Sequence, residues 1–271
     1  MAAGSVGAPA AVGAAPRPRF ASSLWVPLAS FAAFLLLWQA LIVVFEPNEI
    51  LFPGPVAVVG EFVEVARNGL LWSAFLDSMP ALVIGLGLAL IVGPVLGLLI
   101  GMSRIADLLA GPYLWAWFAT PDIALVPLVI IWLGFFIEAK VFMVFVAALI
   151  PLMLSCKDGV QSVDGSLLRA ARSFGASRAR LFRSVMIPST MPFIASGVRN
   201  AVSRGFVGLL VVEVVAGSGG LGTEVMRATR QFNAARTFAF IAALVVIALV
   251  LISLSKRLEA YASRWRDEVA L

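Results

Sequence analysis

The chain has 271 residues, of which 61% are apolar and only 13% are charged, and its net charge is +5. Soluble domains are nearer half apolar and a quarter charged, so this composition predicts an all-α membrane protein. The single cysteine and the absence of histidine exclude an internal disulfide and the usual zinc and iron sites, and we expect no metal centre. The positive charge does not indicate a nucleic-acid partner, because the basic residues lie at the ends of apolar segments.

The first twenty residues are rich in Ala, Gly and Pro. They are predicted to form a disordered tail, residues 1–20, followed by one transmembrane domain, residues 21–271. Six apolar segments of span length are predicted, at residues 24–45, 78–102, 112–135, 140–156, 190–215 and 237–255. The first is long for the apolar part of a signal peptide, and no small-residue cleavage site follows it, so we expect it to remain as a span.

The basic residues predict the orientation of these spans. Of the twenty Lys and Arg residues, thirteen lie in segments on the same side as the N terminus, five lie on the other side, and two lie inside the fifth span. This bias predicts that both termini are cytosolic. It also places residues 157–189, between the fourth and fifth spans, in the cytosol; we call this segment the elbow.

Between the first and second spans, residues 55–68 have the pattern of an amphipathic helix, with Pro55 in its first turn and Gly69 after its end. One face is predicted to carry Val56, Val59, Phe62, Val63 and Ala66. Two interpretations are open: a helix that lies on the bilayer surface, which we favour, and a docking site for an external binding protein.

Small residues recur at every fourth position of the second span, at Gly93, Gly97 and Gly101. This spacing allows two helix backbones to approach closely, either within the chain or across a dimer. We favour packing within the chain.

The third span is interrupted at Thr120-Pro121-Asp122. Pro121 has no N–H group and disfavours helix at Thr120. The carbonyl groups that lose their helical partners are tolerated only where protein or a water-filled cavity meets them. The break is therefore either a packing kink or a bend that lines a pathway.

The fifth span contains Arg204, about 20 Å from its start at 1.5 Å per residue. A charge at that depth either pairs with a carboxylate, for which Asp122 is the first candidate, or lines a water-filled pathway for an anion. We predict that the pathway is lined by the polar residues of the third and fifth spans, Thr120, Asp122, Arg199, Asn200, Ser203 and Arg204.

After the fifth span, the glycine-rich loop Gly217–Gly222 is interpreted as a flexible external gate or turn. It is not interpreted as a phosphate-binding loop, because no Lys-Ser/Thr follows it.

The elbow is predicted to contain two short helices at an angle. Asp164 and Ser177 are each placed to cap a helix, and Gly175 interrupts the pattern between them. Apolar residues are predicted on one face, at Leu168, Ala171, Phe174, Leu181 and Phe182, with arginines at 169, 172, 180 and 183 on the other. We interpret the elbow as a binding site for a partner; a basic loop that only maintains topology is the alternative.

The sequence contains no Walker A motif, no HExxH motif and no paired carboxylates at helical spacing within a span. We therefore expect the protein not to be an enzyme, and any ATP hydrolysis to occur on another subunit.

Several motifs resemble those of permease subunits of ATP-binding-cassette (ABC) importers. The run Arg169-Ala170-Ala171, then Gly175, then Ile187-Pro188, resembles the family's "EAA…G…I-x-L-P" loop. The chain is similar to the nitrate, sulfonate and taurine group over about residues 50–260, through the stretches 52–55, 120–127, 132–134 and 217–222. It departs from the family where Arg169 replaces a Glu, and where Met79-Pro80 replaces a usual Arg.

The resemblance implies a type I ABC importer permease fold in a bacterial plasma (inner) membrane, with six spans and a cytosolic coupling helix between spans four and five. The implied partners are an ATPase pair that binds ATP and Mg²⁺, a second permease subunit in a homodimer or heterodimer, an external solute-binding protein and lipid, with no cofactor on this chain. The implied solute is a small anion, such as a sulfonate, taurine, nitrate or bicarbonate. The residues implied in ATPase coupling are Arg169, Ala170, Ala171, Phe174, Gly175, Ala176 and Pro188. A stand-alone secondary transporter or channel is the alternative, although no internal repeat supports it.

Overall fold

The computed structural model describes residues 25–267, and within this range it contains helices and turns but no strand. It divides into two units, residues 1–46 and 47–271. The first unit has one described helix, α1 (Trp25–Phe45), which has the length and apolar composition of a membrane span. The tail predicted at residues 1–20 lies outside the described residues.

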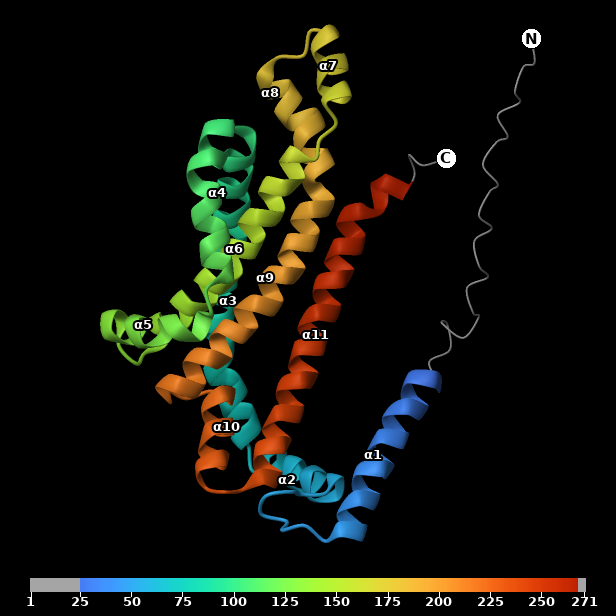
Figure 1. Cartoon of the computed structure of the whole chain (residues 1–271), viewed down its shortest axis with the longest axis vertical. Helices are drawn as coiled ribbons and strands as arrows, with labels where there is room; N and C mark the ends of the chain where they lie inside the picture. The colour runs from blue at the N-terminus through green and yellow to red at the C-terminus, as the bar shows by residue number, and fades with distance from the viewer. Residues whose placement is uncertain (1–24, 268–271) are drawn as a thin grey trace, which may run out of the picture. The chain divides into compact units, whose positions relative to one another are not determined.

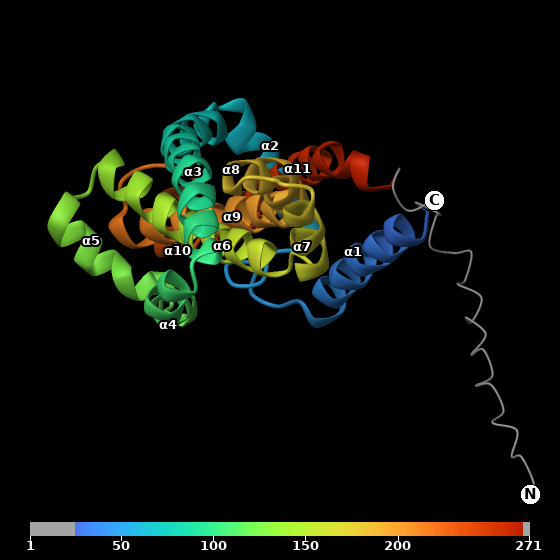
Figure 2. The same ribbon diagram turned by 90° about the horizontal axis from the view of Figure 1, so that it is seen from above.

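The second unit is built around two long helices, α6 (Ile137–Gln161) and α9 (Ile187–Ala216), which pack along one another. Helix α3 (Leu70–Met102) packs on α6, and α11 (Ala234–Asp267) packs on α9 (Figure 1). Figure 2 shows α6 and α9 near the middle of this unit. The span window of α6 is 67% buried, against 22% for α3 and 17% for α11, so α6 is the central helix and the outer two are left to face lipid.

Glycines allow α3 and α6 to approach each other closely. A Cβ added at Gly97 would lie 2.6 Å from the backbone oxygen of Met153, and one added at Gly101 would lie 2.9 Å from that of Lys157. Real Cβ atoms do not come that close, so a larger residue would force the two helices apart. The predicted packing of these glycines within the chain is confirmed.

The segment predicted as a third span at 112–135 consists of two helices rather than one. Helix α4 (Arg104–Ala119) ends before Pro121, and the chain continues through the 3-10 turn η2 (Asp122–Leu125) into α5 (Val126–Leu133). The two halves are bent by 96°. Because Pro121 cannot donate the next helical hydrogen bond, and Thr120 is extended with ψ 129°, the helix stops there.

A second bend of 42° separates the helical segment Ala179–Ala216 from α10 (Leu221–Arg230). Four described helices are individually long and apolar enough to cross a membrane, and there are six such spans if each bent pair counts as one. This agrees with the predicted number of six. The second and fourth spans are longer than predicted, since α3 begins at Leu70 and α6 ends at Gln161.

Short helices mark the two ends of the second unit (Figure 1). At one end are α7 (Gly165–Ser173) and α8 (Arg178–Leu181), and at the other are α2 (Pro55–Arg67) and α10. Helix α2 is amphipathic as predicted, but its apolar residues divide between two faces. Phe62 and Ala66 pack with the fully buried Val65 against Phe240 of α11, whereas Val56 and Val59 are exposed.

Candidate functional site

Arg204, the deepest basic residue predicted in a span, lies in the middle part of α9. One of its guanidinium nitrogens is 3.8 Å from a carboxylate oxygen of Asp122, and the guanidinium lies 5.0 Å from the centre of the Phe118 ring. The Arg204 side chain is 44% exposed and that of Asp122 is 14% exposed. The structure therefore brings together the break in the third span and the basic residue of the fifth, as predicted.

Arg204 belongs to an exposed stripe along α9. Asn200, Val207 and Val215 are also exposed. Along the series 200, 204, 207 and 215 the successive spacings are four, three and eight residues, which places these side chains on one face of the helix. A charged side chain exposed to lipid at mid-span is costly. This face of α9 is therefore suited to contact water or another polypeptide rather than lipid.

Two other predicted pathway residues are hydrogen-bonded within this chain. Arg199 donates a hydrogen bond of 2.8 Å to Glu259 of α11, so it connects two helices of the same chain. The hydroxyl of Thr120 donates to the carbonyl of Ala116 at 2.9 Å and so satisfies the end of α4. Neither contact was anticipated, because the partners are distant in sequence for Arg199 and a backbone group for Thr120.

A second ion pair lies near the α10 end of the bundle and is much more enclosed. Lys140 of α6 and Glu213 of α9 are 3.2 Å apart, and their side chains are 5% and 0% exposed. Glu213 also accepts hydrogen bonds from the hydroxyl of Ser78 at 2.8 Å and from the N–H of Gly222 at 2.9 Å. We call Ser78, Lys140, Glu213 and the bonded glycine loop 217–222 the Glu213 cluster.

The glycine loop is fixed by this cluster. Lys140 donates to the carbonyl of Gly219 at 2.8 Å, and Ser78 accepts from the N–H of Leu221 at 3.0 Å. Gly220 has φ +97°, and a Cβ there would overlap the carboxylate of Glu213. Of the two interpretations of this loop, a gate or a turn, this structure has a turn whose backbone is bonded by buried polar side chains.

The sequence did not predict the Glu213 cluster. Lys140 is the first residue of the predicted fourth span, 140–156, and is one of the five basic residues counted on the side away from the N terminus. One signal could have revealed it. Lys140 and Glu213 are opposite charges at the outer ends of two apolar spans, and ionisable groups in such positions usually pair. The contribution of Ser78 had no comparable signal, since a lone serine in a span usually bonds its own helix.

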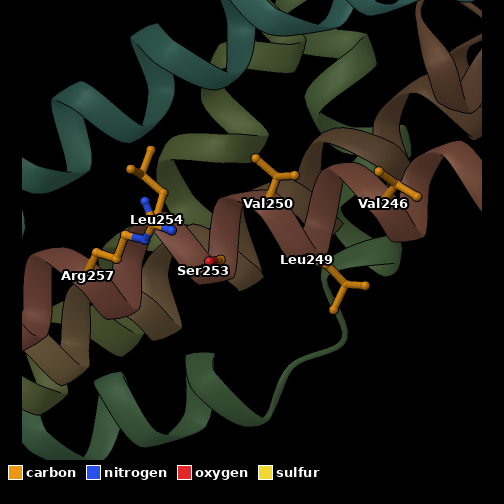
Figure 3. A pocket seen from close by; sticks show the side chains of 6 residues that line it. All are labelled: Val246, Leu249, Val250, Ser253, Leu254 and Arg257. Atoms are coloured by element: carbon orange, nitrogen blue, oxygen red, sulfur yellow. The ribbon is translucent and has the colours of Figure 1, made fainter. Parts of the chain in front are cut away.

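Two cavities of the second unit are apolar. A shallow groove of about 470 Å³ runs along α11. Figure 3 shows Val246, Val250 and Leu254 in a row along this helix, with Arg257 at one end. Such a surface suits lipid chains better than a small polar solute. The cavity bordered by Arg204, Asp122 and Phe118 is only about 10 Å³, so these side chains leave no room for a solute between them.

The elbow has the predicted two-helix form. Asp164 accepts a hydrogen bond from the N–H of Ser166 at 2.7 Å and caps α7, and Ser177 accepts from the N–H of Arg180 at 3.3 Å. Gly175 between them has φ +77°, a conformation that favours glycine. The hydrogen bonds from Ser166 lower the pKa of the Asp164 carboxyl below its usual value.

The predicted apolar face of the elbow is only partly covered. Leu181 is buried, but Phe174 is 90% exposed. Leu167, which was not predicted on this face, is 53% exposed. An aromatic side chain this exposed, next to a fixed turn, is typical of a surface that binds another protein.

The boundaries of the elbow are narrower in the structure than residues 157–189. Lys157 lies inside α6, is buried, and forms an ion pair of 3.1 Å with Asp107 of α4. After α8, a π-helical turn η3 (Phe182–Met186) leads directly into α9, with Pro188 in its first turn. Pro188 therefore does not interrupt the helix, because it directly follows the π-helical turn, where the regular ladder of helical hydrogen bonds is already changed.

The described residues contain no cluster of three potential metal ligands from His, Cys, Asp and Glu. What they contain is a bundle of spans with broken and bent helices, a polar site at mid-span and an exposed elbow at one end. Discontinuous helices with polar residues at mid-span are typical of membrane transport proteins. The fold and the site thus define a membrane permease.

Comparison with known proteins identifies the family. Residues 85–267 match the family model "Binding-protein-dependent transport system inner membrane component". A probable ABC transporter permease of Brucella abortus is 28% identical over 91% of this chain and 97% of its own length. The taurine transport system permease of Escherichia coli is 27% identical over 89% and 90%, and the riboflavin transport system permease of Chloroflexus aurantiacus is 32% identical over 85% and 86%.

The fold has solved counterparts as well. An inward-facing structure of a methionine ABC transporter matches with a TM-score of 0.64 at 17% identity, covering 73% of this chain and 98% of that one. The chain therefore belongs to the family of inner membrane components of binding-protein-dependent transport systems, as its motifs predicted. Members of this family are permease subunits of ABC transporters and not enzymes, which also argues against a stand-alone secondary transporter or channel.

Proposed function

We propose that this chain, with a second permease subunit, forms the pathway of an ATP-driven importer for a small anion of the sulfonate, taurine, nitrate or bicarbonate class. A solute-binding protein outside the membrane delivers the solute. The observation that carries the proposal is the exposed guanidinium of Arg204 in the middle of α9. A positive charge kept at that depth stabilises an anion where water is scarce.

The sign of the charge supports an anionic solute. Arg204 is more exposed than Asp122, so the accessible side of this ion pair is positive. Kinship alone does not decide, because similar permeases are named for both taurine and riboflavin. We therefore base the anion on Arg204 and not on the names of relatives.

In this proposal a pair of ATPase subunits binds the elbow and supplies ATP and Mg²⁺, and the chain has no cofactor of its own. The exposed Phe174 and the turn at Gly175 support this role, since together they present a rigid apolar tip. ATP-driven closure of the ATPase pair then moves the elbow and α9 together, because α8 and η3 continue into α9 without a break. The coupling residues remain those of the motif, Arg169, Ala170, Ala171, Phe174, Gly175, Ala176 and Pro188.

The orientation is with both termini in the cytosol, as the bias of basic residues predicts. Two introduced cysteines test it. In sealed cells, an impermeant thiol reagent should label cysteine at Val59, which is exposed on α2, and should spare cysteine at Phe174. Native Cys156 is fully buried and serves as the unreactive background. Labelling of the Phe174 position from outside would reverse the orientation.

Uptake in a strain that lacks the native gene tests the solute class. Radiolabelled taurine, ethanesulfonate, nitrate and bicarbonate would be compared with riboflavin as an uncharged control. Arg204→Gln should reduce anion uptake by about tenfold or more while the complex still assembles. Arg199→Gln is the matched control, because it removes an arginine from the same helix that already pairs with Glu259. Uptake unaffected by Arg204→Gln would contradict the anion pathway.

Substitutions in the elbow test the coupling. Gly175→Val imposes a β-branched side chain at φ +77°, and Ala171→Glu adds a charge to the apolar face. Both should weaken co-purification of the ATPase or uncouple ATP hydrolysis from uptake, while the binding protein still binds its solute. Arg169→Glu restores the residue usual in the family and is the control for charge. Intact coupling in both variants would leave the elbow as a basic loop without a partner.

A further inference from the structure

We propose that Asp122 occupies the anion site of Arg204 when the pathway is closed, so that an arriving anionic solute must displace it. In the closed state the side-chain carboxylate of Asp122 thus takes the place that the anionic solute occupies during transport. This inference rests on the proposed anion pathway and adds the group that competes with the solute.

The contact between the two residues is unusually loose. At 3.8 Å it is the longest ion pair among the described residues, and it exceeds hydrogen-bonding distance. The Asp122 carboxylate forms no hydrogen bond within the described part of the chain, and its side chain is 14% exposed. A partly exposed carboxylate whose ion pair is this long is weakly held, so little keeps it in place against a competing anion.

Arg204 is held in place independently of Asp122. Its guanidinium lies 5.0 Å from the centre of the Phe118 ring, a distance at which a cation and a ring attract each other. It also projects from the middle of a continuous helix. When Asp122 withdraws, Arg204 therefore keeps its position and presents a free guanidinium, which binds a carboxylate or sulfonate through two parallel hydrogen bonds.

Asp122 is the partner that moves. It lies directly after the break at Thr120-Pro121, where the chain turns by 96° between two helices. The N–H of Thr120 bonds backward to Trp117, and the carbonyl of Pro121 accepts from Ala124, so no described backbone hydrogen bond joins the segments on either side of the break. Rotation at these two residues shifts Asp122 without disrupting α4 or α5.

The side of Arg204 that faces Asp122 has no room for a solute, because the cavity between these side chains is only about 10 Å³ while Asp122 is in position. Arg204 itself is 44% exposed, so an anion reaches its guanidinium from the open side. An anion that binds in the position of the Asp122 carboxylate therefore requires Asp122 to withdraw. A cationic or uncharged solute does not displace Asp122 in this way, which makes the pair a selectivity element.

Protection of a cysteine tests the competition without knowledge of the natural solute. Val207 is exposed on α9, one turn from Arg204, and would be replaced by cysteine in the complete complex in proteoliposomes. Its reaction with neutral N-ethylmaleimide would be measured while ethanesulfonate replaces chloride at constant ionic strength. Asp122→Asn should lower the half-protecting concentration of ethanesulfonate about tenfold relative to wild type, and Arg204→Gln should abolish protection.

Each other outcome has a definite meaning. Equal half-protecting concentrations in wild type and Asp122→Asn, with protection still lost in Arg204→Gln, would overturn the competition and leave the anion pathway standing. Protection that survives Arg204→Gln, or a cysteine at Val207 that never reacts, would overturn both. Absence of protection in wild type and Asp122→Asn alike would do the same.

Two further variants complete the design. Glu259→Gln frees Arg199 on the same helix and should leave the half-protecting concentration unchanged. Asp122→Ser is the alternative if Asp122→Asn does not assemble with its partners. Failure of both substitutions to assemble would show that the carboxylate is structural, and would overturn the proposal.

Discussion

Two ion pairs of the second unit, Lys140–Glu213 and Arg204–Asp122, differ in how the protein surrounds them. Glu213 is fully buried and accepts three hydrogen bonds from Lys140, Ser78 and the backbone of Gly222. Asp122 faces Arg204 at 3.8 Å without a hydrogen bond, and Arg204 is exposed. A charge that is enclosed and fully bonded maintains a structure, whereas one that is exposed and loosely paired is available to a ligand.

The difference arises from the backbones that carry the two acids. Glu213 lies near the end of a continuous helix, and the glycine loop folds back over it, with Gly220 and Gly222 leaving no space for a side chain. Asp122 lies in a short 3-10 turn after a proline, where the helical ladder is interrupted. The Glu213 cluster thus fixes one end of the bundle. The break at mid-span, which lacks such bonds, is able to move relative to this fixed end.

The largest effect is expected from breaking the buried pair. Glu213→Gln or Lys140→Met leaves one buried charge without its partner, which destabilises the protein by about 3–5 kcal/mol. We expect little complex in the membrane and a lower temperature of aggregation in detergent. The double substitution should recover part of this loss, because no charge is then left unpaired. Stable single variants would show that the pair is not structural, and the comparison would fail.

A smaller but clear effect is expected from Gly220→Ala. The added Cβ meets the carboxylate of Glu213 and is strained at φ +97°, so we expect a loss of roughly 1–3 kcal/mol. Gly87→Ala is the matched control, because nothing lies within 4 Å of its Cβ and alanine favours helix. Thermal aggregation of the two purified complexes would compare them. Equal stability would indicate that the glycine loop adjusts, contrary to its fixed position.

Features that depend on residues close together in the chain were predicted correctly from the sequence. Six spans, the break at Pro121, the caps at Asp164 and Ser177 and the turn at Gly175 all follow from apolar length, proline and glycine chemistry, and capping residues. These features depend on neighbours in the chain, so a single sequence contains them.

What the sequence could not predict depends on residues far apart in the chain. The bond from Ser78 to Glu213 and the pairing of Arg199 with Glu259 arise only when helices pack. Asp122 was named as a candidate partner of Arg204 because few carboxylates lie at that depth. The looseness of their contact, from which its function is inferred, had no signature in the residues themselves.

A modest effect is expected for the ion pair between Arg199 of α9 and Glu259 of α11. The hydrogen bond is short, at 2.8 Å, but both side chains are partly exposed, so the surrounding medium screens it. Arg199→Gln should lower stability by about 0.5–1 kcal/mol and leave anion uptake unchanged. Measuring both the melting temperature and the anion uptake of Arg199→Gln separates an effect on stability from an effect on transport. A loss of uptake without a loss of stability would assign Arg199 to the pathway beside Arg204.

The smallest effect is expected at the cap of the elbow. The N–H of Ser166 bonds the Asp164 carboxylate and lowers its pKa, so the cap is complete above the ordinary aspartate range and weakens only as the pH falls through this lowered pKa. Between pH 5 and 8, hydrogen exchange of residues 165–173, corrected for intrinsic rates, should not change in wild type. Asp164→Ala should raise it throughout, whereas Asp164→Asn should not, because asparagine also caps helices. A pH-dependent change in wild type within that window would mean that the cap is not held by the carboxylate, and the elbow would then be fixed by contacts other than its own backbone.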